Sequence, residues 1–120
     1  MKTPNFRFPR KEKLKGRDNI RALFSGKKGI SYPGAKLFFL PNALPHNRIA
    51  FTLPRKYGNA VERNYSRRLS REAYRQLKNE LRKGYDLVLL IYPGRDEYSV
   101  RMEQLRVLFT RSRLFRREQA

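Results

Sequence analysis

The sequence contains no cysteine and no tryptophan, and it has a single histidine. The lack of cysteine excludes disulfides, zinc–thiolate sites and thiol catalysis. No apolar stretch approaches the roughly 18 residues that a membrane-spanning helix needs. The first residues are basic, but they lack the apolar run of a secretory signal. These features predict a cytoplasmic protein with no membrane partner.

Acidic residues are also scarce. The chain has 10 Asp and Glu residues against 29 Lys and Arg residues, which gives a formal net charge of +19 over 120 residues. This excess cannot be balanced inside one small domain, so the folded chain must repel itself. A charge of this kind usually needs a polyanionic partner. Nucleic acid is the first candidate, and an anionic membrane surface is the weaker alternative.

The side chains that protein nucleases use are missing as well. Acid–base ribonucleases generally need a pair of histidines, or a histidine with a carboxylate. Only His46 is present, and it lies in a predicted turn between Pro45 and Asn47. Metal-dependent nucleases need several carboxylates around one or two ions, whereas the acids here are scattered. We therefore assign no catalytic residue and no metal ligand to this chain.

The pattern of apolar residues predicts one α+β domain over residues 1–120. Helices and strands are expected in the order α-β-β-β-α-β-α. The predicted segments are a flexible basic arm (1–17), a short helix that Asp18 caps (18–24), strands within 30–53, a long helix (60–83), a buried strand (86–92), a last helix (98–109) and a basic tail (111–120).

The long helix is the clearest of these elements. Gly58 breaks the chain before it, Asn59 and Glu62 form a possible capping box, and Gly84 is expected to end it. Its apolar side is predicted to hold Val61, Tyr65, Leu69, Ala73, Tyr74, Leu77 and Leu81. Its other side is a cationic stripe of Arg63, Arg67, Arg68, Arg71, Arg75, Lys78 and Arg82. Arginine suits phosphate because its guanidinium can donate two parallel hydrogen bonds.

The start of this helix resembles a known signature. Residues 56–72 resemble that of the bacterial ribonuclease P protein component, K-x-G-x-A-V-x-R-N-x-x-[KR]-R-x-x-R-E. The matching residues are Lys56, Gly58, Ala60, Val61, Arg63, Asn64, Arg67, Arg68, Arg71 and Glu72. There are two departures. Tyr65 stands where the family commonly has Arg, and Ile20 aligns where it often has Phe.

The resemblance implies an α/β sandwich with a left-handed β–α–β crossover around the long helix. It also implies two RNA partners, a catalytic RNA and precursor tRNA, and removal of the tRNA 5′ leader. Hydrolysis would belong to the RNA subunit, with Mg²⁺ bound mainly by that RNA. The residues implied for the catalytic RNA are Lys56, Arg63, Asn64, Arg67, Arg68 and Arg71, and those for the leader are Phe24, Phe38 and Phe39. A core role is the alternative for these phenylalanines.

Three other functions remain open from the residues alone. A structural RNA-binding protein of ribosomal type fits the composition and the charged helix equally well. A DNA-binding regulator is less favoured, because strand-like segments flank the long helix and no helix-turn-helix is visible. An autonomous nuclease is disfavoured by the missing catalytic groups.

The net charge predicts that RNA binding depends steeply on salt. Each phosphate that the chain neutralises releases counterions, so the logarithm of affinity should fall with the logarithm of salt concentration. The slope should be roughly −0.7 to −0.9 for each neutralised phosphate. A titration with labelled RNA at several salt concentrations measures this slope, and a nearly flat dependence would contradict binding through phosphates.

Overall fold

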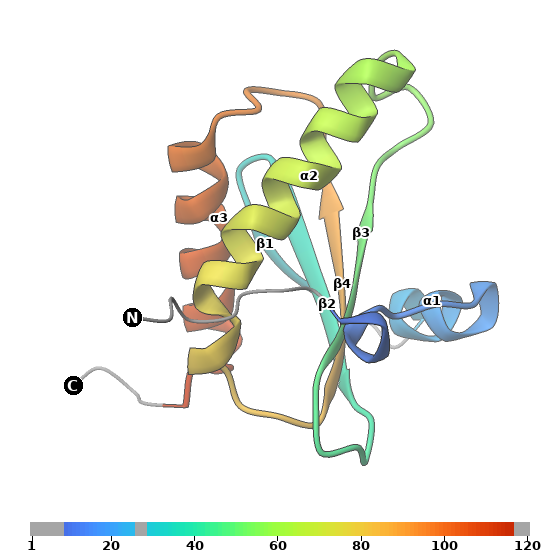
Figure 1. The fold of residues 1–120 in the computed structure, drawn as a ribbon, viewed down its shortest axis with the longest axis vertical. Helices are drawn as coiled ribbons and strands as arrows, with labels where there is room; N and C mark the ends of the chain where they lie inside the picture. Colours follow the sequence, from blue (N-terminus) through green and yellow to red (C-terminus); the bar gives the residue numbers. More distant parts are fainter. Residues whose placement is uncertain (1–8, 26–28, 117–120) are drawn as a thin grey trace.

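The computed structural model of the chain describes residues 9–25 and 29–116 as one four-stranded sheet with helices on both faces (Figure 1). The elements are η1 (Arg10–Glu12), α1 (Arg17–Ser25), β1 (Gly29–Tyr32), β2 (Ala35–Pro41), β3 (Arg48–Thr52), α2 (Ala60–Leu77), η2 (Lys78–Glu80), β4 (Tyr85–Ile91) and α3 (Tyr98–Arg111). Helices α2 and α3 cover one face of the sheet and α1 packs on the other. The α+β class and the predicted order of helices and strands are confirmed.

The central strand, β4, is the last strand along the chain. The strand order is β1-β2-β4-β3, with β2 antiparallel and β3 parallel to β4. Three consecutive residues of β4, Leu87, Val88 and Leu89, are fully buried. A strand that is covered on both faces needs such an uninterrupted apolar run. The sequence prediction of a buried strand here is therefore confirmed.

The connection between the two parallel strands has an unusual hand. The chain leaves β3, passes through α2 and returns as β4. In Figure 1 both strands run upward, α2 lies in front of the sheet, and β4 lies to the left of β3. The crossover is therefore left-handed, whereas about 98% of such connections are right-handed. This is the topology that the resemblance implies.

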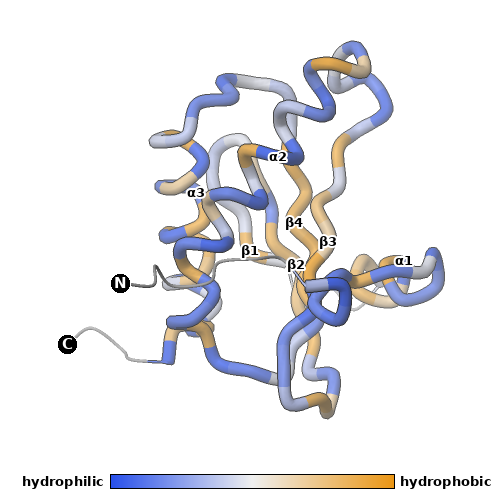
Figure 2. Tube along the Cα trace, in the orientation of Figure 1, coloured by the Kyte–Doolittle hydropathy of each residue, from blue (hydrophilic) through white to orange (hydrophobic). Residues whose placement is uncertain are grey.

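Alternation along the strands divides the core into two clusters, because successive side chains point to opposite faces. The larger cluster lies under α2 and α3 and contains Leu37, Leu89 and Phe109. The smaller cluster lies under α1 and contains Leu23 and Phe38. In Figure 2, β2 and β4 are coloured largely as hydrophobic, while long stretches of α2 are hydrophilic.

Helix α2 is shorter than the sequence predicts. It ends at Leu77 and is followed by the short 3₁₀ turn η2, so the expected helix to residue 83 is wrong. Leu81 is extended and fully buried, and it forms an isolated β-bridge with Phe115. The N–H of Arg82 donates to the Leu114 carbonyl at 2.6 Å. Pairing with the end of the chain thus satisfies backbone groups that further helix would have used.

Parts of both predicted terminal segments pack on the body. Within the arm, the N–H of Leu14 donates to the Ile49 carbonyl at 2.9 Å, and the Leu14 side chain is buried. Residues 1–8 lie outside the described residues. In the tail, Leu114 is buried, and residues 111–116 end α3 and pair with the segment that follows η2. The predicted basic tail is thus ordered on the body as far as residue 116, and 117–120 lie outside the described part.

The first helix starts one residue before its predicted cap. The N–H of Ile20 donates to the Gly16 carbonyl at 3.1 Å, and Gly16 has a φ of +99°. Asp18 thus lies within the first turn of α1, where a negative charge still favours the helix dipole.

Candidate nucleic-acid interface

A capping box fixes the start of α2. Asn59 Oδ1 accepts from the Glu62 N–H at 2.9 Å, and Glu62 Oε1 accepts from the Asn59 N–H at 3.0 Å. Gly58 precedes it with a φ of +151°, and a Cβ there would lie 2.6 Å from the same carboxylate oxygen. The predicted box is confirmed. The box fixes the residue at which α2 begins, and this determines which side chains of the helix face outward.

The inward side of α2 differs from the predicted apolar stripe. Leu69, Ala73 and Leu77 are buried as expected. Val61 and Tyr65 are 76% and 47% exposed, so their assignment to the core is wrong. In Figure 1 the N-terminal end of α2 extends beyond the ends of the strands, so no part of the sheet lies beneath it.

The outward side of α2 and the segment before it carry cations and one amide. Lys56, Asn64 and Arg68 are exposed, and Arg67 and Arg71 are half-buried. In residues 9–25 and 29–116, none of these five side chains has a hydrogen bond or ion pair with another residue. Their polar groups are therefore available to a partner.

Arg63 is the exception among the six residues that the resemblance implies for the catalytic RNA. Its Nη1 donates to the Pro54 carbonyl at 2.6 Å, and the side chain is half-buried. The hydrogen bond ties the segment before α2 to the helix itself. Arg63 thus holds part of the surface in place while it adds positive charge to it.

The nearby carboxylates do not neutralise this surface. Glu62 is engaged in the capping box, and Glu72 forms an ion pair with Arg75 at 3.2 Å. The cations of the outward side consequently keep their charge unopposed, which suits binding to a polyanion.

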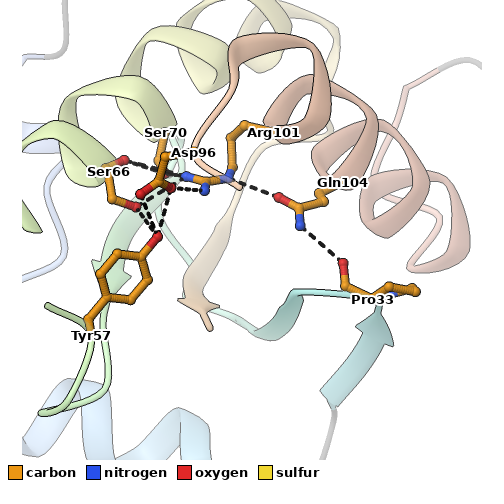
Figure 3. A network of polar contacts seen from close by, with 7 residues as sticks. All are labelled: Pro33, Tyr57, Ser66, Ser70, Asp96, Arg101 and Gln104. Atoms are coloured by element: carbon orange, nitrogen blue, oxygen red, sulfur yellow. Dashed lines mark hydrogen bonds and ion pairs between the residues drawn. The ribbon is translucent and has the colours of Figure 1, made fainter. Parts of the chain in front are cut away.

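Behind this surface lies a buried guanidinium (Figure 3). Arg101 of α3 is 1% exposed, and its Nη2 lies 2.6 Å from Asp96 Oδ1. Its Nε donates to Gln104 Oε1 at 2.9 Å, and its Nη1 donates to the hydroxyl of Ser70 in α2. A buried charge is costly unless it is paired and hydrogen-bonded, and this guanidinium is both.

The contacts of Arg101 extend to the segments around α2. The Tyr57 hydroxyl donates to the Asp96 carboxylate at 2.7 Å and accepts from the Ser66 hydroxyl at 3.0 Å. Gln104 Nε2 donates to the Pro33 carbonyl at 3.0 Å, in the turn between β1 and β2. The network therefore joins the segment before α2, the N-terminal half of α2, the loop before α3 and the β1–β2 turn.

The network also shifts the acidity of Tyr57. Burial raises the pKa of its hydroxyl above the usual value, the hydrogen bond with Ser66 opposes the rise, and the Asp96 carboxylate adds to it. Tyr57 therefore keeps its proton at neutral pH and remains a donor to Asp96. As a neutral group, the hydroxyl links Asp96 in the loop before α3 to Ser66 in α2.

Sequence reasoning missed Arg101. A signal was present, because Arg101 lies one helical turn before Leu105 and two turns before Leu108, on the apolar side of α3. A cation at a core position needs a partner, and Asp96 is five residues earlier. Ser66 and Ser70 were also missed, because hydropathy places serine on the outside.

A second surface lies on the other face of the sheet, beside α1. The rings of Phe24 and Phe38 meet edge to face, with centroids 4.8 Å apart and planes at 75°. Phe24 is 37% exposed, and Phe38 is buried beneath it. Lys36 Nζ lies 5.2 Å from the centroid of the Phe38 ring. One aromatic face with a neighbouring cation is thus open to a partner.

The third predicted leader residue does not share this surface. Phe39 follows Phe38 in the same strand, so its side chain points to the opposite face of the sheet. There it packs against the larger cluster, with its ring 6.2 Å from that of Tyr85. Of the two neighbouring phenylalanines named for the leader, Phe38 therefore lies beside Phe24 and Phe39 does not.

No site for hydrolysis emerges from the residues that the structure describes. Within them, no group of three His, Cys, Asp or Glu residues could hold a metal ion. His46 lies in the β2–β3 turn, where its carbonyl accepts from Asn42 Nδ2 at 3.3 Å. No described helix is both long and apolar enough to cross a membrane.

Known proteins decide between the remaining alternatives. A family model described as Ribonuclease P matches residues 8–113. The chain belongs to the bacterial ribonuclease P protein family. Members of this family are the protein subunit of ribonuclease P, which processes the 5′ end of tRNA. The family suggested by residues 56–72 is confirmed, and the ribosomal alternative is set aside.

Individual relatives agree in sequence and in structure. The ribonuclease P protein component of Natranaerobius thermophilus is 38% identical over 84 residues, 70% of this chain and 73% of that protein. That of Petrotoga mobilis is 36% identical over 83 residues, covering 69% and 70%. The solved Thermotoga maritima protein has a TM-score of 0.70 at 26% identity, covering 81% and 94%. The Staphylococcus aureus protein shares the fold, with a TM-score of 0.78 at 17% identity over 87% and 97%.

The buried guanidinium gives a prediction about stability. Arg101→Met should lower the free energy of unfolding by about 3–5 kcal/mol, because it leaves Asp96 without its cation and the serine hydroxyls without their donor. Arg106→Met is the matched control, since Arg106 is exposed on the same helix and should change stability by less than about 0.5 kcal/mol. Urea unfolding measures both. Equal stability of the two variants would show that the network does not hold the fold.

Proposed function

We propose that the outward side of α2 binds the catalytic RNA of ribonuclease P. The observation that carries this proposal is the set of polar side chains without protein partners, Lys56, Asn64, Arg67, Arg68 and Arg71. They lie on a capped helix and the segment before it, and the Arg101 network braces both from behind. A rigid array of arginines can meet successive phosphates with little loss of side-chain freedom.

The α1 side of the sheet is proposed to hold the 5′ leader of precursor tRNA. A leader is single-stranded, so its bases are free to stack on aromatic rings, and such stacking tolerates any base. Phe24 offers a partly exposed ring, Phe38 supports it from below, and Lys36 adds a cation beside them. The two surfaces lie on opposite faces of the sheet, so the two RNAs can bind together.

Phosphodiester hydrolysis is assigned to the RNA partner. The chain itself is proposed to bind the catalytic RNA and to orient precursor tRNA on it. Mg²⁺ is proposed to be bound mainly by the RNA. We also infer a cytoplasmic location, since precursor tRNA is the substrate proposed here. Adding the purified chain to a ribonuclease P RNA and following 5′ maturation of precursor tRNA tests this assignment. Maturation without any added RNA subunit would refute it.

The α2 surface can be tested by removing two of its cations. Arg67→Ala with Arg68→Ala should weaken binding to ribonuclease P RNA roughly tenfold or more, because charge-assisted phosphate contacts are lost. The salt slope should become shallower by about 1.5. The matched control is Lys83→Ala with Arg106→Ala, which also lowers the net charge from +19 by two, but at exposed positions away from α2. Equal losses in the two double variants would indicate that only total charge matters.

The leader surface can be tested by comparing two tRNA forms. Phe24→Leu keeps most of the volume but removes the stacking ring. It should weaken binding of precursor tRNA roughly fivefold or more and leave mature tRNA unchanged, because only the precursor has a leader. Phe39→Leu is the control, since Phe39 packs on the opposite face. The ratio of the two dissociation constants, measured on variants shown to be folded, decides the matter. An unchanged ratio in Phe24→Leu would return Phe24 to a packing role.

A further inference from the structure

Two apolar side chains stand out on the surface assigned to the catalytic RNA. Val61 is 76% exposed, and Tyr65, one helical turn later, is 47% exposed. Single exposed apolar residues are common on protein surfaces and need no explanation. These two, however, are neighbours on one helix face, where they form a continuous exposed apolar surface.

Tyr65 has no use inside the fold. In the part of the chain that the structure describes, its ring meets no other aromatic ring, and its hydroxyl has no hydrogen bond. Buried tyrosines of the same chain are engaged, since Tyr57 bonds Asp96 and Tyr74 packs against Phe109. Tyr65 therefore leaves part of its ring open to a partner.

The surroundings of Tyr65 indicate what covers it. Arg68 follows it by three residues, so the two side chains are neighbours on the helix surface, and Asn64 lies one turn before Arg68. Neither has a partner among the described residues. Tyr92 and Tyr98 are exposed too, but they belong to the segment after β4 and to the start of α3, not to α2. Among the described aromatic residues, Tyr65 is the one that combines an open ring with the unpaired cations of α2.

A matching ligand must present a flat apolar face beside a negative charge. An unpaired nucleobase on its phosphate backbone does so, and RNA-binding proteins commonly stack such bases on aromatic rings. We propose that Tyr65 is a stacking platform for one unpaired nucleobase of the partner RNA. Val61 extends the apolar floor, and Arg68 contacts the adjoining phosphate. This inference rests on the proposed role of α2 in binding RNA.

Substitutions at position 65 separate stacking from the other ways a tyrosine binds RNA. Tyr65→Phe should bind a bacterial ribonuclease P RNA transcript as the natural chain does, because the ring is kept. Tyr65→Ala should bind roughly 5- to 100-fold more weakly. Its salt slope should not change, because no phosphate contact is lost, whereas Arg68→Ala should make the slope shallower by roughly 0.7 to 0.9. A loss in Tyr65→Phe equal to that in Tyr65→Ala would assign the contact to the hydroxyl and overturn stacking.

Fluorescence gives a direct readout, because the chain contains no tryptophan. Tyr65→Trp introduces the only indole on the proposed platform, and stacking on a base should quench its emission when the RNA transcript is added. Leu44→Trp is the control. Leu44 is 36% exposed in the β2–β3 connection, at the opposite end of the molecule from the start of α2 (Figure 1). Quenching confined to position 65 supports the platform, and equal or absent quenching at both positions overturns it.

The same experiments distinguish failure of this inference from failure of the proposed function. If the natural chain binds the transcript, and loses affinity through Arg67→Ala with Arg68→Ala, then α2 is the RNA surface. An unaffected Tyr65→Ala variant in that case overturns the stacking platform alone. If the double arginine variant also binds normally, α2 is not the RNA surface, and both proposals fall.

Discussion

The buried guanidinium of Arg101 is the interaction on which the arrangement of the α2 surface depends. It is surrounded by oxygen acceptors from α2, α3 and the loop before α3, and through Asp96 it reaches the segment before α2. The N-terminal end of α2 extends beyond the strands, so the sheet offers no apolar packing there. Directional hydrogen bonds replace that packing and set the orientation of the helix that carries the cations.

The acidic residues of the chain are used mainly to hold it together. Within the described residues, ion pairs join Asp86 with Arg48, Glu12 with Lys78 and Asp96 with Arg101. The first two pairs link separate elements, and the third holds the loop before α3 against that helix. These few carboxylates are drawn inward, and the cations left over face outward. The same scarcity of acid thus fixes internal contacts and leaves a polycationic exterior. Association with RNA relieves the resulting self-repulsion, so folding and binding favour one another.

Much of the fold was predictable, because it rests on local signals. Short stretches of sequence predict three features: the capping box at Asn59, the run of apolar residues in β4 and the order of the elements. The errors arose where distant segments decide the outcome. Helix α2 ends early because Leu81 pairs with Phe115, a partner that periodicity cannot reveal.

The candidate site shows the same limit. The cations of α2 could be predicted from their spacing, but the partial burial of Arg63, Arg67 and Arg71 could not. The exposure of Val61 and Tyr65 could not be predicted, because hydropathy alone assigns apolar residues to the core. The start of α2 extends beyond the sheet, so no core lies beneath it. The buried serines of α2, Ser66 and Ser70, were missed because hydropathy predicts that polar residues are exposed. Their hydroxyls are buried here because Arg101 supplies hydrogen bonds to them. The resemblance to a family supplied the partner, which physical patterns alone left open.

The strand order has a consequence for how the chain acquires its structure during synthesis. The β1–β2 hairpin can close as soon as it emerges, but β3 has no neighbouring strand until β4 arrives to lie between it and β2. The ribosome must therefore release residue 91 before the sheet can be completed, and α2 must already have crossed over it. A contact of such long range in sequence slows folding. The cationic helix is consequently exposed to the RNA-rich surroundings of the ribosome before the domain beneath it has closed.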